Sequence, residues 1–78
     1  MKVVYSNQAV DYLDKQTDKQ AARIKNAVSA LPAGDVKKLK GIVNGYRLRV
    51  GSVRVLFERV GEKVTVVKID NRGDVYKG

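Results

Sequence analysis

The 78-residue sequence contains no cysteine and no histidine. Without cysteine, neither a disulfide nor a thiolate metal site can supplement the small core that a chain of this length can bury. Without histidine, the chain lacks the usual acid–base group at neutral pH and the commonest metal ligand. These absences exclude zinc chemistry, Cys–His catalysis and Ser–His–Asp catalysis, so any catalysis must use other side chains.

Long hydrophobic runs are also missing. No apolar segment approaches the ~20 residues that span a bilayer. The N-terminus, Met1 to Tyr5, runs directly into a strand-like pattern, with neither the apolar core nor the cleavage site of a signal peptide. We therefore expect one soluble domain over residues 1–78, with a cytoplasmic location and no membrane partner.

Positive charge, in contrast, is abundant and unevenly distributed. The sequence has 16 lysine and arginine residues against 8 aspartate and glutamate residues, which gives a net charge of +8. Between Val36 and Phe57 there is no acidic residue, and the basic residues there are Lys37, Lys38, Lys40, Arg47, Arg49 and Arg54. This distribution favours a polyanionic partner, such as nucleic acid, the ribosome or an acidic protein, over a merely solvated basic surface.

The first half of the sequence predicts a short strand at residues 3–5 and then two helices. Ser6 is a suitable N-cap for the first helix, and Thr17, with the spacing of a capping box, begins the second. The first apolar stripe consists of Ala9, Val10, Leu13 and in part Tyr12. The second consists of Ala21, Ile24, Ala27, Val28 and Leu31. Pro32 ends this helix, and residues 33–35 are expected to form a loop.

From Tyr46 the apolar period changes to two, which is typical of a strand with one buried face. Gly51 and Ser52 suit a two-residue type II′ turn, which pairs Val50 with Val53. Directly paired residues share a face of the sheet. The apolar face then holds Tyr46, Leu48, Val50, Val53, Val55 and Phe57. The opposite face holds Arg47, Arg49 and Arg54.

A further strand is predicted over residues 64–70. The apolar pattern selects a three-residue loop at 61–63, because loops of two or four residues would turn Lys68 into the core. The expected pairs are Val60 with Val64, Phe57 with Val67, and Val55 with Ile69. In this register the arginine face gains Val66, Lys68 and Asp70. The predicted order is β-α-α-β-β-β with a C-terminal extended piece: an α+β domain with two N-terminal helices packed on one face of a small, mainly antiparallel sheet.

Three arginines on one face of a hairpin repel one another, with Arg49 directly opposite Arg54. One interpretation is a solvated outer face. The functional interpretation is a preassembled phosphate site, because each guanidinium offers a bidentate fork to phosphate oxygens. Arg72 and Lys68 would converge on the same surface, whereas Asp70 would lock one arginine in a structural ion pair.

Four stretches of the sequence, taken together, carry a family resemblance: Lys38-Leu39-Lys40-Gly41, Tyr46 to Val50, Val53 to Glu58, and Arg72 to Lys77. They resemble the RelE/ParE toxin superfamily. The resemblance covers nearly the whole chain and implies a RelE-like toxin of a type II toxin–antitoxin system. In the RelE branch that toxin is a metal-independent, ribosome-dependent mRNA endonuclease without a cofactor. The resemblance also implies a cognate antitoxin, acidic in the segment that binds the toxin.

The resemblance further implies roles for particular residues. The catalytic positions fall on Arg54, Arg72 and Tyr76. The two basic-strand positions fall on Arg47 and Arg49. Beside them, the basic segment and the strand register add Lys38, Lys40 and Lys68 to the residues that we predict to bind RNA. A ribose 2′-OH would attack the adjacent phosphorus, and Tyr76 is the candidate base because surrounding positive charge favours its phenolate. Arg54 and Arg72 would stabilise the charge that builds on the phosphate oxygens.

The sequence departs from the family at Arg47 and Arg49, because members of the family often have lysine at these two positions. Arginine is a poor proton donor, so the departure bears on catalysis. Two other functions remain open: a ParE-like, non-catalytic inhibitor of DNA gyrase, and an inactive basic module that binds RNA or an antitoxin. The set of Arg54, Arg72 and Tyr76 favours the nuclease, because ParE-type members generally lack an assembled site.

Overall fold

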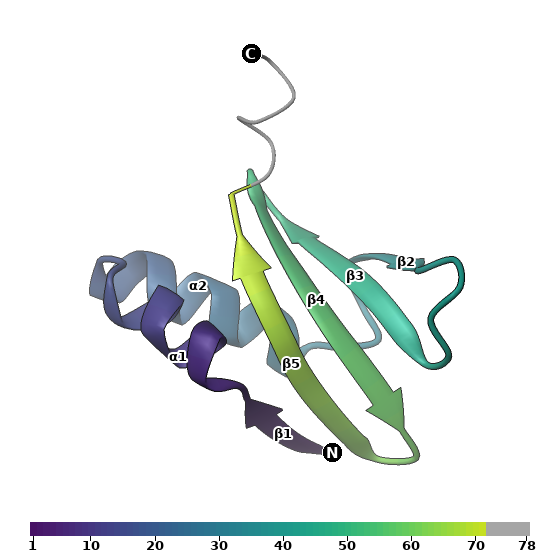
Figure 1. Ribbon diagram of the computed structural model, residues 1–78. Helices are drawn as coiled ribbons and strands as arrows, with labels where there is room; N and C mark the ends of the chain where they lie inside the picture. Colours follow the sequence, from purple (N-terminus) through teal and green to yellow (C-terminus); the bar gives the residue numbers. More distant parts are fainter. Residues whose placement is uncertain (72–78) are drawn as a thin grey trace.

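The structure is a computed structural model that describes residues 1–71. Within this range a strand is followed by two helices and four further strands (Figure 1). The elements are β1 (Lys2–Tyr5), α1 (Asn7–Asp14), α2 (Asp18–Ser29), β2 (Asp35–Lys38), β3 (Gly45–Val50), β4 (Val53–Val60) and β5 (Lys63–Asp70). The predicted β-α-α-β-β-β order is therefore correct except for β2, which begins at the end of the expected loop.

The strands form one sheet in the order β1-β5-β4-β3-β2. β1 runs parallel to β5, and the remaining neighbours are antiparallel. Figure 1 shows both helices on the same side of this sheet. The predicted α+β architecture, with two N-terminal helices on one face of a mainly antiparallel sheet, is confirmed.

Both helices begin at the predicted caps. The Ser6 hydroxyl accepts a hydrogen bond from the backbone N–H of Ala9 at 3.1 Å, and the Thr17 hydroxyl accepts one from Gln20 at 3.1 Å. Each bond satisfies a backbone donor that has no partner within the helix. α2 ends at Ser29, upstream of Pro32. No helix of residues 1–71 is long and apolar enough to cross a membrane.

The core lies between the helices and the sheet face that they cover. Its buried side chains are Ala9, Leu13, Ile24, Val28, Leu31, Leu48, Val50, Val53, Val55, Phe57, Val64, Val66 and Ile69. Tyr46 stacks on Phe57 at the end of this layer, with ring centroids 5.5 Å apart. The apolar face predicted for the β3–β4 hairpin is thus confirmed. Val10, predicted to be in the helical stripe, is instead 45% exposed.

The β3–β4 hairpin has the predicted register. Val50 pairs with Val53 across the turn, and Arg49 pairs with Arg54. Gly51 has φ +62°, the backbone conformation that a type II′ turn requires at its first central residue. Glycine adopts this conformation without the steric cost of a Cβ atom.

The predicted β4–β5 register is wrong near the turn. The turn is a two-residue one, since Val60 pairs with Lys63. A β-bulge then restores the pattern: Phe57 pairs with Val66, Leu56 pairs with Lys68, and Val67 is left over between them. A bulge inserts one extra residue and so changes which face the following residues occupy. Val66 therefore joins the core instead of the arginine face, while Lys68 and Asp70 lie where they were predicted.

Matched valine-to-threonine substitutions test this register. Val66 is 0% exposed and Val67 is 43% exposed. Val66→Thr should lower the free energy of unfolding by about 1–3 kcal/mol, because it buries a hydroxyl without a partner. Val67→Thr should change it by less than about 0.5 kcal/mol. Urea unfolding measures both values, and the reverse ranking would support the three-residue loop.

Candidate nucleic-acid interface

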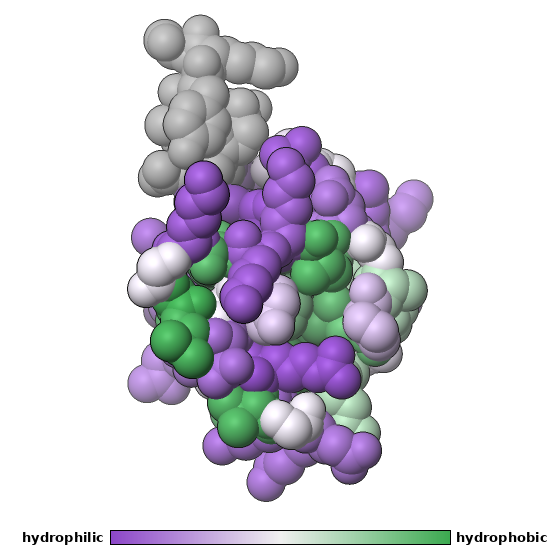
Figure 2. Space-filling model, turned by 90° about the vertical axis from the view of Figure 1, so that its right-hand side faces the viewer, coloured by the Kyte–Doolittle hydropathy of each residue, from purple (hydrophilic) through white to green (hydrophobic). Residues whose placement is uncertain are grey.

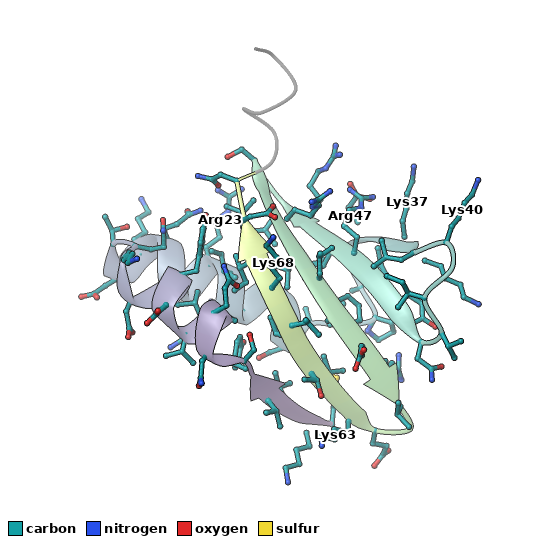
Figure 3. All side chains as sticks on the ribbon, viewed as in Figure 1. Arg23, Lys37, Lys40, Arg47, Lys63 and Lys68 are labelled. Atoms are coloured by element: carbon teal, nitrogen blue, oxygen red, sulfur yellow. The ribbon has the colours of Figure 1, made fainter. Side chains whose placement is uncertain are left out.

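The sheet surface opposite the helices, formed by β2, β3, β4 and β5, is called here the open face, and no element of residues 1–71 covers it (Figure 1). Cross-strand pairing arranges its upper part in two rows of side chains. The aspartate row contains Asp35, Arg49, Arg54 and Asp70. The lysine row contains Lys37, Arg47, Leu56 and Lys68. Figure 3 labels Lys37 on β2, Arg47 on β3 and Lys68 on β5.

Arg54 is held by a carboxylate in the aspartate row. Its Nε lies 3.5 Å from Oδ1 of Asp70, and the two side chains are 28% and 18% exposed. Within the described residues, Arg54 Nε and both Asp70 oxygens are buried without a hydrogen-bond partner. The opposite charge of the guanidinium is therefore what compensates this carboxylate. The expectation that Asp70 locks an arginine in an ion pair is confirmed.

Arg47 makes a different kind of ion pair. Its Nη2 lies 3.5 Å from Oδ1 of Asp35, on the neighbouring strand β2. The Arg47 side chain is only 11% exposed, whereas that of Asp35 is 56% exposed. Water screens such an exposed carboxylate, so this pair adds little to stability. Arg49 lies between the two pairs and is exposed.

Leu56 occupies the middle of the lysine row. It is half-buried, although no helix or strand of residues 1–71 covers this face. Its direct cross-strand neighbours are Arg47 and Lys68, and the exposed Lys68 can cover apolar surface with its aliphatic stem while its charged end remains outside. The row thus presents an apolar centre with cations on both sides.

The structure brings together only part of the predicted site. Arg47, Arg49, Arg54 and Lys68 share the open face, as expected. Lys38 pairs with Tyr46 and therefore belongs to the helix-side face, and Lys40 lies in the loop between β2 and β3. Arg72 and Tyr76 lie outside the described residues.

Lys37 and Asp35 belong to the open face and were not predicted to be part of it. Both lie on β2, where only Val36 shows burial, so the four residues lack an apolar alternation from which a strand could be predicted. The available signal was the sequence Asp35-Val36-Lys37, whose alternation of polar and apolar residues is too short to distinguish a strand from a loop.

Tyrosines that could accept a proton are absent from the open face of residues 1–71. Tyr46 stacks on Phe57 on the helix side. Burial raises the pKa of Tyr5. Burial, and to a lesser degree the negative charge of Asp70, raises the pKa of Tyr12. Both shifts favour the neutral phenol, so neither residue is prepared to act as a base.

Two other surface features of the described residues do not form a site. A pocket of about 110 Å³ on the helix side is lined by Leu31, Pro32, Val36, Tyr46, Phe57 and Arg59. It is smaller than the ~300–1,000 Å³ of ordinary ligand pockets. Figure 2 shows hydrophobic areas that are separated by hydrophilic side chains instead of forming one apolar patch.

No group of three carboxylate side chains in residues 1–71 could hold a metal ion.

No protein-family model matches the chain, and no curated protein matches it. Solved structures are similar over nearly its whole length. A chain of the RelB–RelE antitoxin–toxin complex from Methanococcus jannaschii has 25% identity and a TM-score of 0.75, with 95% of both chains covered. A chain of the RelE–RelB complex from Pyrococcus horikoshii has 24% identity and a TM-score of 0.74, and the match covers 92% of this chain and 94% of that one. A variant of the E. coli toxin RelE in the free state has 19% identity and a TM-score of 0.72, and the match covers 97% of this chain and 90% of that one.

These similarities first define a class, that of small α+β domains in which two helices cover one face of a five-stranded sheet. Within this class the chain has the fold of the RelE toxins. The predicted resemblance to the RelE/ParE superfamily is confirmed by this fold. Because a fold hosts more than one function, the activity has to be inferred from the side chains of the open face.

The two ion pairs should contribute unequally to stability. Asp70→Asn removes the charge that compensates a partly buried guanidinium, so we expect a loss of about 1–3 kcal/mol in the free energy of unfolding. Asp35→Asn removes an exposed partner and should cost less than about 1 kcal/mol. Urea unfolding at low ionic strength measures the difference, and equal losses would show that the burial of Asp70 has no energetic consequence.

Proposed function

We propose that this chain is the toxin of a type II toxin–antitoxin system and that it cleaves mRNA on the ribosome. The observation that carries the proposal is the uncovered sheet face, on which five cations from four adjacent strands lie on a RelE fold: Lys37, Arg47, Arg49, Arg54 and Lys68. Two carboxylates, Asp35 and Asp70, lie among them, so the upper part of the face keeps an excess of positive charge. Such a surface favours the phosphate backbone of a nucleic acid.

The proposed reaction is an internal displacement at phosphorus. The ribose 2′-oxygen forms a bond to the adjacent phosphorus as its proton leaves, and the bond to the 5′-oxygen breaks. The products are a 2′,3′-cyclic phosphate and a 5′-hydroxyl end, whose oxygen takes up a proton. Arg54 stabilises the charge on the non-bridging oxygens, and a cation that is already in position needs no reorganisation during the reaction. The ion pair with Asp70 supplies that preorganisation.

The other residues of the proposed site bind and orient the RNA. Arg47 and Arg49 hold the backbone on either side of the scissile phosphate, and guanidinium groups are suited to this because they bind phosphate oxygens bidentately. Tyr76 accepts the proton of the 2′-hydroxyl, and Arg72 shares the charge stabilisation with Arg54. Both of these late residues follow β5, the strand that carries Lys68 and Asp70.

The proposed protein partner is a cognate antitoxin. The similar structures from M. jannaschii and P. horikoshii are complexes of a toxin with its antitoxin. A partner that neutralises this chain would carry acidic residues in the segment that covers the open face, because charge complementarity both steers association and excludes RNA.

Primer extension on an mRNA in a translating extract tests the proposed activity. Wild-type protein should create new 5′ ends, and Arg54→Ala and Tyr76→Phe should each reduce the cleavage rate by a factor of about 10² or more. Lys25→Ala, which removes one exposed charge from α2, is the matched control and should cleave normally.

Two outcomes would contradict the proposal. Wild-type protein that creates no new 5′ ends while it arrests DNA supercoiling by gyrase would identify a ParE-like inhibitor. Cleavage that is unchanged in both Arg54→Ala and Tyr76→Phe would remove these residues from the reaction. Circular dichroism of each variant separates a loss of activity from a loss of folding.

A further inference from the structure

We infer that the RNA backbone binds along the lysine row, with Lys37 as one of its ligands, and that Asp35 competes with the bound phosphate for Arg47. This inference rests on the proposed function, because it specifies which part of the open face the RNA occupies. It assigns a specific binding role to Lys37, which the sequence places only in a generally basic segment, and a competing role to Asp35.

The two rows differ in charge. The aspartate row holds two arginines and two aspartates, so its formal charges cancel. The lysine row holds three cations, Lys37, Arg47 and Lys68, and no acid. Asp35 forms its ion pair across the rows with Arg47, so the cations of the two rows that are in no ion pair within residues 1–71 are Lys37 and Lys68 in the lysine row and Arg49 in the aspartate row. A polyanion is attracted most strongly where positive charge is uncompensated, so the lysine row, with two such cations and no carboxylate of its own, is the better binding surface.

The carboxylates of Asp35 and Asp70 are buried to unequal extents. Asp70 is 18% exposed and its oxygens are shielded, so its release from Arg54 would leave a buried charge without compensation. Asp35 is 56% exposed and regains its full hydration when it leaves Arg47. Arg47 itself is 11% exposed, so an anion beside its guanidinium is favoured over none. A phosphate can take the place of Asp35 at Arg47 at little cost, but not that of Asp70 at Arg54.

The lysine row also has a shape that suits an extended nucleic-acid chain. Its four positions lie on four adjacent strands, which are about 4.8 Å apart, so the row extends across the sheet over about 14 Å. Leu56, at an inner position, offers an apolar contact for a ribose or a base between the phosphate-binding cations. A single-stranded RNA that crosses the sheet from β2 to β5 would therefore meet two cations, then the apolar Leu56, and then a third cation.

Equilibrium binding of a fluorescent single-stranded RNA oligomer tests the lysine row. The oligomer carries 2′-O-methyl riboses, so that it cannot be cleaved, and the binding constant is measured by anisotropy over a range of salt concentrations. Lys37→Ala and Lys68→Ala should each weaken binding severalfold and reduce the slope of log K against log salt by about 0.7, the contribution of one single-strand phosphate contact. Lys25→Ala, the control of equal charge change, should leave the slope unchanged.

The competing role of Asp35 predicts a gain in affinity. Asp35→Asn should tighten RNA binding severalfold because Arg47 is then free for phosphate. Asp11→Asn on α1 changes the net charge equally and should have a much smaller effect. Equal gains in both variants would show that only net charge matters and would overturn the inference. A binding slope that Lys37→Ala leaves unchanged would overturn it as well.

Failure of this inference is distinguishable from failure of the proposed function. Wild-type protein that binds the oligomer through Lys37 and Lys68 but cleaves no mRNA would refute the nuclease and leave the lysine row as an RNA-binding surface. Wild-type protein that cleaves mRNA, with Lys37→Ala and Lys25→Ala equal in oligomer binding, would refute the lysine row and leave the nuclease.

Discussion

The burial of one sheet face beneath α1 and α2 is the constraint from which the open face follows. Each large aliphatic side chain that leaves water contributes about 1.5–3 kcal/mol. A pair of like charges directly across two strands costs only about 0.2–1 kcal/mol. Burial of Leu48 and Val55 on the helix side therefore outweighs the repulsion between Arg49 and Arg54 on the other. The basic surface is maintained by the core behind it.

The sequence predicts the fold well wherever two independent signals agree. In the β3–β4 hairpin, the apolar alternation and the turn at Gly51 both select the same register, and that register is found. At the β4–β5 turn an uninterrupted apolar alternation predicts a three-residue loop. The chain instead combines a two-residue turn with a bulge at Val67. A bulge keeps both Val66 and Ile69 in the core, but no residue type in this segment indicates one.

The candidate site was predictable to the same extent. The positions of Arg47, Arg49 and Arg54 follow from the hairpin alone, and Lys68 follows from the apolar pattern around it. The pairing of Asp35 with Arg47 depends on β2, an edge strand of four mostly exposed residues that tertiary contacts with β3 specify. The sequence therefore indicates which cations share a face. It also indicates that Asp70 pairs with an arginine, but it does not indicate that Asp35 pairs with Arg47.

In this domain Asp70 and Asp35 each pair with one arginine of the open face, Arg54 and Arg47, while Lys37, Arg49 and Lys68 stay available. The central claim is that the open face binds single-stranded RNA. An amide NMR titration of the protein with an uncleavable RNA oligomer tests it most directly. The largest shift changes should occur in β2 to β5, at residues of the open face. If the largest changes instead fell on α1 and α2, the RNA would bind the helical side and the claim would be wrong.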